Sequence, residues 1–347
     1  LSFKRYGPLS LKRNLFEKIQ TNDKFEKFIY NSLPEIFPRN YIENFKFIKK
    51  NIDYLNWPKN PKVIFTSFDH YINDVFKIYT MQKKAKGAKL YLMQHGHQGL
   101  HPSCMTGFVE QRISDKFFTW GSKNKSNINS IPTFCATTVG KKIKRKSNKN
   151  ILLSYTEFFI KPWKNMPLPR TQEETDIYKN DIIDTLNYLN NNQENRIYLK
   201  YNSNITKNDY ITNELKHKFK KLRFIKTDLK KRGFEYSDKF KLNIETTNST
   251  GFIELLSLNT PVILITNKKF FDIKKEYKKY FDALIKSNII FFDTKKASDF
   301  IKLNIDNLDG WWFDKFTQNN INYFCNNICK FQGELNKGFD KILNEIR

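Results

Sequence analysis

The sequence predicts an α/β protein with two lobes, each built around a parallel β-sheet. Short runs of β-branched and aromatic residues alternate with longer stretches in which apolar residues recur at helical spacing. Alternation at these lengths is typical of parallel strands covered by helices. With 347 residues, the chain is also long for one hydrophobic core and natural for two domains.

We expect the chain to divide into four segments. Residues 1–140 form an N-terminal lobe with a helical extension, and residues 141–150 form a basic linker that follows Gly140. Residues 151–308 form a C-terminal lobe. Residues 309–347 are aromatic and helical, and we expect them to pack across the seam between the lobes.

The N-terminal lobe opens with residues 1–58, whose apolar spacing predicts helices without recognisable chemistry. A buried strand at 63–68 leads into Asp69 and a helix that ends near Gly87. Later strands are predicted at residues 89–93 and 116–120, and residues 133–140 are expected to close the lobe.

A loop rich in histidine and glycine, residues 94–102, follows the strand at 89–93 and is one candidate site. Open α/β sheets hold their sites at the carboxyl ends of parallel strands. Glycine lets the backbone close on a ligand, and histidine can donate to an anion or exchange protons near neutral pH. The alternative is a polar turn with incidental histidines. His95, His97 and His101 form no helical pair and have no acidic partner at a familiar spacing, which disfavours a metal site.

The C-terminal lobe alternates regularly between strands and helices, which predicts a doubly wound parallel sheet. Its strands are predicted at residues 151–155, 196–201, 223–226, 242–246, 262–266 and 289–292. Its helices are predicted at residues 173–189, 209–219, 249–258, 271–285 and 297–303.

The start of the helix at 249–258 is the other candidate site. Ser249 or Thr250 can cap this helix, and Gly251 lets a ligand approach its first turn. Free N–H groups and the positive end of the helix dipole suit a phosphate. Glu254, one turn further along, lies within reach of a ribose hydroxyl. The alternative is a capped core helix whose hydroxyls serve only the cap.

The chain is strongly basic, with 61 Lys and Arg against 35 Asp and Glu and a net charge of +26. This balance favours an anionic partner, which could be a nucleic acid, an anionic membrane face, or charged sugars and nucleotides. Part of the excess reflects a general abundance of Lys, Asn, Ile and Phe. Because no nucleic-acid-binding motif occurs, a nucleic-acid partner is unlikely.

Several classes of protein are disfavoured by what the sequence lacks. It has no GxGxxG fingerprint for NAD or FAD and no P-loop for an ATPase. Its four cysteines form no CxxC pair, so neither a zinc site nor a disulfide framework is predicted. No run of 18 apolar residues and no signal-peptide core occurs, so we expect a cytoplasmic protein without a membrane span. Two Rossmann-like lobes with a cleft between them suggest a nucleotide-sugar enzyme of the GT-B type.

Over residues 60–265, the chain resembles a bacterial family of surface-carbohydrate transferases. The resemblance rests on an ordered set of motifs: Met93-Gln94-His95-Gly96, Glu110, residues 113–121, residues 196–200, and residues 248–261. That family is similar to capsule Kdo transferases and retaining pseudaminic acid transferases, which are GT-B-like and use CMP-activated nonulosonic acids. Its Gln-His-Gly loops usually continue with glycine, whereas here His97 and Gln98 intervene.

The resemblance implies a division of labour between the lobes. The C-terminal lobe would bind the nucleotide, with Ser249, Thr250 and the helix start on the phosphate and Glu254 near the ribose. The full implied nucleotide set is Arg196, Lys200, Asn248, Ser249, Thr250, Gly251 and Glu254. A CMP-sugar leaves as a nucleoside monophosphate with no diphosphate for a metal to bridge, so no cofactor and no metal are expected.

The N-terminal lobe would bind the acceptor and hold the reacting carbon. Gln94, Gly96 and His97 would contact substrate, together with His95 as a catalytic candidate. Glu110 is the leading base or nucleophile, and Asp69 is the second choice. The alternative for Glu110 is a surface carboxylate or an ion-pair partner of its neighbour Arg112.

The resemblance thus implies a retaining glycosyltransferase that adds a CMP-activated nonulosonic acid, of pseudaminic acid or Kdo type, to a bacterial surface polysaccharide. The acceptor would be a glycan or lipid-linked glycan, and the positive charge could hold the enzyme at the anionic inner membrane face. One alternative is a UDP-sugar or polyol-phosphate transferase on the same scaffold. Another is a basic nucleic-acid-binding protein.

Overall fold

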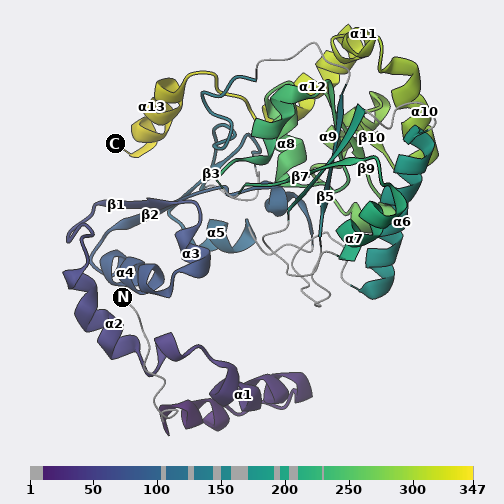
Figure 1. Cartoon of the computed structure of the whole chain (residues 1–347). Helices are drawn as coiled ribbons and strands as arrows, with labels where there is room; N and C mark the ends of the chain where they lie inside the picture. Colours follow the sequence, from purple (N-terminus) through teal and green to yellow (C-terminus); the bar gives the residue numbers. More distant parts are fainter. Residues whose placement is uncertain are drawn as a thin grey trace. The chain divides into compact units, whose positions relative to one another are not determined.

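The computed structural model describes residues 11–102, 107–123, 129–143, 150–157, 171–190, 196–202, 210–228 and 230–346. The chain forms two compact units, Leu1–Tyr91 and Leu92–Arg347 (Figure 1). The expected linker at 141–150 falls within the second unit, and its residues 144–149 lie outside the described part. The predicted division into four segments therefore stays a prediction.

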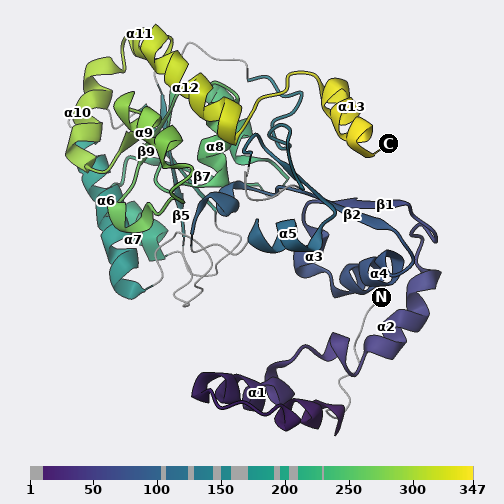
Figure 2. The same ribbon diagram turned by 180° about the vertical axis from the view of Figure 1, so that it is seen from behind.

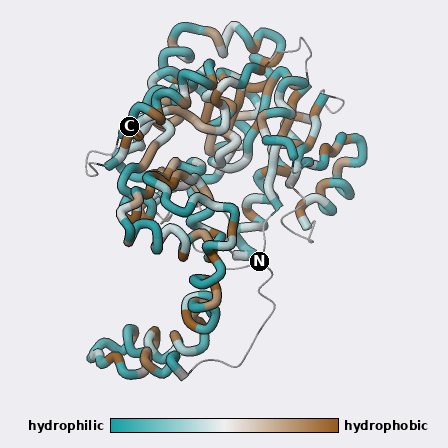
Figure 3. Tube along the Cα trace, turned by 90° about the vertical axis from the view of Figure 1, so that its left-hand side faces the viewer, coloured by the Kyte–Doolittle hydropathy of each residue, from teal (hydrophilic) through white to brown (hydrophobic). Residues whose placement is uncertain are grey.

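The first unit is mostly helical, as predicted for residues 1–58. Its elements are η1 Leu11–Lys18, α1 Lys24–Ile36, η2 Arg39–Tyr41, α2 Phe45–Asn51, η3 Ile52–Tyr54, β1 Val63–Thr66, α3 Asp69–Ile72, α4 Asp74–Lys84 and the start of β2 Lys89–Met93. Figure 3 shows apolar and polar positions interleaved along these helices. A buried ion pair joins η1 to the segment after η2, because the Arg13 guanidinium donates to both carboxylate oxygens of Glu43 at 2.7 and 2.8 Å.

The second unit contains a six-stranded sheet in which each neighbouring pair is parallel. Its strands are β5 Ile151–Thr156, β6 Ile197–Asn202, β7 Arg223–Lys226, β8 Leu242–Glu245, β9 Val262–Ile265 and β10 Ile290–Phe291. The order β10-β9-β8-β5-β6-β7 runs outward in both directions from the central pair β5 and β8. The predicted doubly wound parallel sheet is confirmed.

A smaller sheet has the order β1-β2-β3-β4. Strands β3, Lys116–Thr119, and β4, Ser130–Pro132, pair in parallel. Strand β4 lies in the polar connection before residues 133–140. Residues 136–140 form turns, and the expectation that residues 133–140 close the lobe stays a prediction.

Helices cover both faces of the six-stranded sheet (Figures 1 and 2). Helices α6, α7 and α10 share one apolar core with the strands, and α8, α9 and α12 cover the other face. The helices of this unit are η4 His97–Leu100, α5 Phe108–Ile113, α6 Gln172–Asn190, α7 Tyr210–Lys218, η6 Gly233–Lys239, α8 Thr250–Ser257, η7 Lys268–Phe270, α9 Lys278–Lys286, α10 Thr294–Asn304, α11 Leu308–Trp312, α12 Lys315–Ile328 and α13 Leu335–Ile346.

The helix predicted at residues 271–285 begins later than expected, at Lys278. Its first half is diverted because the Lys274 backbone N–H donates to the Leu100 carbonyl at 2.9 Å, outside any helix.

In the helical tail, Cys325 and Cys329 are buried free thiols, as is Cys135. Among the described residues, no helix combines the length and apolar character needed to cross a bilayer.

The strands alternate between two faces, and this alternation positions the site. The core beneath α6, α7 and α10 contains Ile151, Leu153, Tyr155, Ile197, Leu199, Tyr201, Leu242, Ile244, Ile263 and Ile265. Side chains one position away point to the opposite face. The polar side chains among these include Ser154, Lys200 and Glu245.

Candidate functional site

Three polar side chains lie side by side across the middle of the six-stranded sheet. Ser154 on β5 is in register with Lys200 on β6 and with Glu245 on β8. They are 6%, 9% and 7% exposed, respectively. Strands covered on both faces are normally apolar throughout, and neighbouring strands lie about 4.8 Å apart. A buried row of hydroxyl, ammonium and carboxyl groups at this position points to a binding site.

The row forms part of the wall of a pocket of about 330 Å³. The pocket lies at the carboxyl ends of β5, β6, β7 and β8, and it includes the point between β5 and β8 where the strand order reverses. Open α/β sheets bind ligands at such a reversal. Its lining consists of Ser154, Tyr155, Thr156, Lys200, Tyr201, Thr227, Asp228, Lys231, Gly233, Tyr236, Glu245, Ser249 and Gly251.

The Lys200 ammonium has spare hydrogen-bonding capacity. It donates to the Gly233 carbonyl at a long 3.4 Å and lies 5.9 Å from the centre of the Tyr236 ring. An ammonium carries three donors. Within the described part of the chain this is its one hydrogen bond, so donors are left for an anionic ligand in the pocket.

Glu245 is a buried carboxyl beside the first turn of α8. Burial raises the pKa of Glu245 above its ordinary value, and the positive charge of Lys200 offsets part of this rise. Its Oε2 lies 3.7 Å from the point that a Cβ on Gly251 would occupy. Glu245 is therefore the member of the polar row that lies next to the helix start.

The start of α8 faces the pocket through Ser249 and Gly251. Ser249 occupies the N-cap position, but its side chain accepts no capping hydrogen bond. The expectation that Ser249 or Thr250 caps the helix is therefore wrong for Ser249, whose hydroxyl lines the pocket. Asn248, just before it, is 3% exposed, and its amide has no hydrogen-bond partner among the described residues.

The histidine-containing loop contacts the same helix start. The built position of a Cβ on Gly96 lies 2.7 Å from Thr250 Oγ1, so no side chain fits there without a shift. His97 Nδ1 lies 3.2 Å from the same oxygen. Sequence reasoning assigned these two motifs to different lobes, whereas the structure brings them together within one unit.

Gln94 holds the loop in shape. Its Oε1 accepts from the Trp120 backbone N–H at 2.8 Å, and its Nε2 donates to the Gly96 carbonyl at 2.7 Å. Both ends of the amide are used within the protein. Gln94 therefore positions Gly96, and it does not line the pocket.

His97 and His101 are buried with their rings 4.9 Å apart. Burial lowers the pKa of His97 well below its ordinary value, and the neighbouring His101 lowers it further. Burial also lowers the pKa of His101 to about 4, although the Asp272 carbonyl opposes this. Both rings are neutral at pH 7, which differs from the expectation of proton exchange near neutrality. His95 differs from both in being exposed.

The two acidic catalytic candidates lie outside the pocket lining. Glu110 is buried at the start of α5, where its carboxylate accepts from the Gly107 N–H. It is therefore not a surface carboxylate. Asp69 is exposed in the first unit, at the start of α3, with its carboxylate 3.4 Å from the Thr66 hydroxyl.

Two residues of the expected nucleotide set also lie outside the lining. Arg196 precedes β6, about 13 Å along the chain from Lys200 and at the strand end away from the pocket. Glu254 is buried within α8. Burial raises the pKa of Glu254, while a hydrogen bond from Thr137 and the charges of Arg232 and Lys200 lower it.

Sequence reasoning found Lys200, Ser249 and Gly251 in the pocket and missed other wall residues, including Ser154, Glu245, Lys231 and Tyr236. A signal for two of these exists. Strands β5, β6 and β8 begin with the segments ILLS, IYLK and LNIE, each with a polar residue in fourth position. Recognising that these three polar residues form a row requires the register of strands that are distant in sequence.

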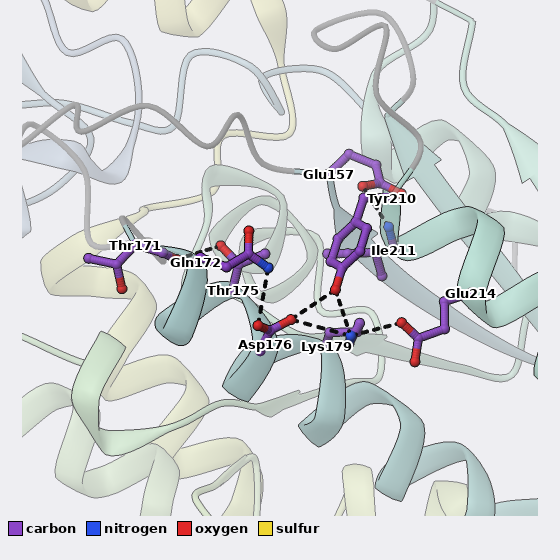
Figure 4. Close-up of polar contacts among 9 residues, drawn as sticks. All are labelled: Glu157, Thr171, Gln172, Thr175, Asp176, Lys179, Tyr210, Ile211 and Glu214. Carbon is purple, nitrogen blue, oxygen red and sulfur yellow. Dashed lines mark hydrogen bonds and ion pairs between the residues drawn. The ribbon is translucent and has the colours of Figure 1, made fainter.

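A second polar cluster joins α6, α7 and the residue after β5 (Figure 4). Glu157, directly after β5, accepts from the Ile211 and Thr212 N–H groups at 3.2 and 2.5 Å and so caps α7. Burial lowers the pKa of Lys179, but hydrogen bonds to Glu214, Tyr210 and Asp176 outweigh it and raise the pKa above its ordinary value. The Lys179 ammonium lies 3.3 Å from the Asp176 carboxylate and 2.8 Å from that of Glu214, and it donates to the Tyr210 hydroxyl at 2.9 Å. This cluster ties α6 to α7.

The described residues contain no group of three or more His, Cys, Asp or Glu side chains arranged to hold a metal ion.

Comparison with known proteins gives one family and a set of similar folds. Residues 4–341 match the family described as LIC12162 family transferase. No curated protein matches the chain. Among solved structures, the chain is similar to the S. aureus MnaA-UDP co-structure, with 13% identity over 91% of this chain and 85% of that one and a TM-score of 0.51. It is similar to UDP-GlcNAc 2-epimerase from Neisseria meningitidis bound to UDP-GlcNAc, with 10% identity over 93% and 89% and a TM-score of 0.51.

TarM is a third similar structure, with 12% identity over 86% of this chain and a TM-score of 0.49. The chain spans 57% of the length of TarM. The similarity to the first two structures confirms the predicted fold class, a GT-B-like α/β fold with parallel sheets.

Proposed function

The chain belongs to the LIC12162 family of transferases, and from that premise we propose that it is a glycosyltransferase whose donor nucleotide binds in the pocket of the six-stranded sheet. The observation that carries the proposal is the buried row of Lys200, Ser154 and Glu245 beside the start of α8. The row supplies a cation, a hydroxyl and a carboxyl within one pocket.

The donor phosphate would bind between Lys200 and the first turn of α8. Unpaired N–H groups at a helix start favour a phosphate, and a charge-assisted hydrogen bond from an ammonium adds to this. Because Lys200 is nine-tenths buried, its charge is screened less by water than a surface lysine. Lys231 would contribute a second, more exposed cation at the rim.

A sugar hydroxyl of the donor would be held by Glu245. The resemblance suggested Glu254 for the ribose, but Glu254 does not line the pocket, whereas Glu245 does. We therefore propose Glu245 in place of Glu254 as the hydroxyl ligand.

Transfer would break the bond between the sugar's anomeric carbon and the phosphate oxygen and form a bond to an acceptor oxygen. Charge develops on the leaving phosphate, where Lys200 and the α8 N–H groups would stabilise it in the transition state. The acceptor's proton passes to a base. Of the three candidates, His95 is exposed and adjoins Gly96, so we propose it first, ahead of Glu110 and Asp69.

For the donor, we propose a CMP-activated nonulosonic acid of pseudaminic acid or Kdo type, transferred to a bacterial surface glycan or lipid-linked glycan. Retention requires that the acceptor oxygen attack the same face of the sugar that the phosphate leaves. The motif resemblance supports this choice of donor, and the carboxylate of such a sugar suits Lys231 at the rim. A UDP-sugar is the second candidate, because the two similar structures are described with UDP and UDP-GlcNAc. Cytoplasmic location at the inner membrane face belongs to the same proposal.

The Gly251→Ala variant tests the site. A Cβ at this position would meet Ser249 Oγ at 3.5 Å and Glu245 Oε2 at 3.7 Å, which are ordinary contacts, so the fold should tolerate it. The added methyl group would occupy the place where the phosphate approaches the helix. We expect calorimetric titration with CMP and with UDP to show at least tenfold weaker binding of the preferred nucleotide at an unchanged melting temperature. Unchanged affinity for the nucleotide would show that it does not bind in this pocket.

A further inference from the structure

Besides the basic linker at residues 141–150, positive charge is dense in a second segment of the second unit. Residues 216–241 contain eleven Lys and Arg against three Asp and Glu, a net charge of +8. These 26 residues thus hold eight of the 26 net positive charges of a 347-residue chain. General compositional drift would spread the charge evenly, so this concentration needs a local cause.

The segment includes one edge of the six-stranded sheet, because β7 is its outermost strand. The segment covers the end of α7, the outermost strand β7 and the helix η6. We call six of its exposed members the basic edge, namely Lys216, Lys218, Lys220, Lys226, Lys230 and Lys231. The segment reaches the proposed nucleotide pocket, whose wall includes Lys231, Gly233 and Tyr236.

Several cations of this segment are held against aromatic rings. The Lys216 ammonium lies 5.6 Å from the centre of the Phe224 ring, and the Lys231 ammonium lies 6.0 Å from that of Tyr236. The Arg223 guanidinium lies 5.3 Å from the ring of Tyr198. Cation–π contacts of this kind restrict long side chains before any ligand arrives, which lowers the entropic cost of binding.

The basic edge presents charge without apolar anchors. None of the exposed large hydrophobic side chains of the described residues lies within residues 216–241. Surfaces that settle into a lipid interface combine basic residues with exposed aromatic and aliphatic ones. A group of exposed cations without such anchors fits a hydrophilic polyanion better than a bilayer.

We propose that the basic edge binds the acceptor, and that the acceptor is an anionic glycan whose acidic groups lie along β7 and the residues up to Lys231 while its reactive end enters the pocket. This inference rests on the proposed glycosyltransferase function. Opposite charge along the basic edge would give the complex its affinity and a strong dependence on salt.

The test compares two triple charge reversals. The edge variant is Lys218→Glu, Lys220→Glu and Lys226→Glu. The matched control changes the net charge equally on exposed lysines of α9 and α10, as Lys278→Glu, Lys296→Glu and Lys302→Glu. The probe is labelled polygalacturonate, a glycan with one carboxylate per sugar, with neutral dextran alongside, and affinity is measured by fluorescence anisotropy at several salt concentrations.

We expect salt-sensitive binding of polygalacturonate to the wild type, at least tenfold weaker binding to the edge variant, and less than a twofold change in the control. Nucleotide affinity should be unchanged in both variants. Equal losses of affinity in both variants would show that only the overall charge of the protein matters. If the wild type does not bind polygalacturonate, the proposal is wrong, and the lysines would then serve to prevent another strand from pairing with β7. Binding of vesicles containing phosphatidylserine, or of an oligonucleotide, in preference to the glycan would also overturn the proposal.

The experiments distinguish failure of the acceptor proposal from failure of the donor proposal. A loss of nucleotide affinity in the edge variant alone would assign these lysines to the donor site. Failure of Gly251→Ala to weaken nucleotide binding would overturn the proposed function while leaving any glycan binding at the basic edge in place.

Discussion

At the scale of single residues, Lys200 is the side chain on which the proposed site depends most. Its ammonium is nine-tenths buried and, among the residues that the structure describes, makes one long hydrogen bond, to the Gly233 carbonyl. A buried cation costs free energy unless it is paired, and Glu245 is in register one strand beyond Ser154. A phosphate in the pocket would complete its pairing.

The first prediction follows from this residue. Lys200→Met keeps the apolar stem and removes the charge, so nucleotide affinity should fall by about ten- to a hundredfold, as for the loss of one charged hydrogen bond. Calorimetric titration measures the effect, with Lys302→Met, an exposed change on α10, as the control. Equal affinities in the two variants would show that Lys200 does not touch the ligand.

The second prediction concerns the pH dependence of stability at Glu245. Burial raises its pKa in the folded protein above the ordinary 4.5, so the folded state holds the proton more tightly than the unfolded state. Its contribution to stability is therefore fully present below pH 4.5 and is lost as the pH rises through the folded-state pKa. Melting temperatures of Glu245→Gln should decline less than those of the wild type between pH 4.5 and 8. Parallel curves for the two proteins would contradict the raised pKa.

At the scale of elements, the contact between the histidine-containing loop and α8 joins the two motifs that sequence reasoning singled out. Gly96 and Thr250 are 154 positions apart in the sequence, and the built Cβ of the first would overlap the hydroxyl of the second. The Gln94 amide fixes the turn from the other side through the Trp120 N–H. The position of the helix start therefore depends on the loop.

The third prediction uses this contact in a double-mutant cycle. Gly96→Ala should lower the free energy of unfolding by about 1–3 kcal/mol, because its methyl group overlaps Thr250 Oγ1. Thr250→Ala removes that oxygen, so the double variant should recover most of the loss. Urea unfolding measures the three variants. Additive effects would mean that the loop and the helix start are not coupled.

The fold was largely predictable from the sequence, because it depends on local patterns. The strands that start at Ile151, Leu242 and Val262 were found from apolar runs rich in β-branched residues, and the structure places strands there. The helix expected from residue 271 was wrong in its first half, since the Lys274 N–H bonds to Leu100, 174 positions earlier. Local periodicity does not carry such long-range contacts.

The site was predictable only in part. The helix start at Ser249 and Gly251 was found, because capping residues and glycine before an apolar run are local signals. The row of Ser154, Lys200 and Glu245 was not found as a row, because it exists only once three strands are in register. Arg196 and Lys200 were both expected to bind the nucleotide, but Arg196 precedes β6 and three strand residues separate it from Lys200.

At the scale of the whole molecule, the second unit contains both the pocket and the basic edge, and the two are continuous through Lys231. The family assignment establishes a transferase, and the fold is GT-B-like. The donor and acceptor classes are our proposals. Together they describe an enzyme in which an anionic acceptor approaches along β7 towards a donor held at the carboxyl ends of β5, β6 and β8.

The central claim is that the nucleotide binds beside the row of Lys200, Ser154 and Glu245. The most direct measurement is a crystal structure of the wild-type protein with CMP, and a second one with UDP. We predict nucleotide density in this pocket, with its phosphate within hydrogen-bonding distance of Lys200 Nζ and the Gly251 N–H. A nucleotide bound elsewhere, with the pocket filled only by water, would contradict the account.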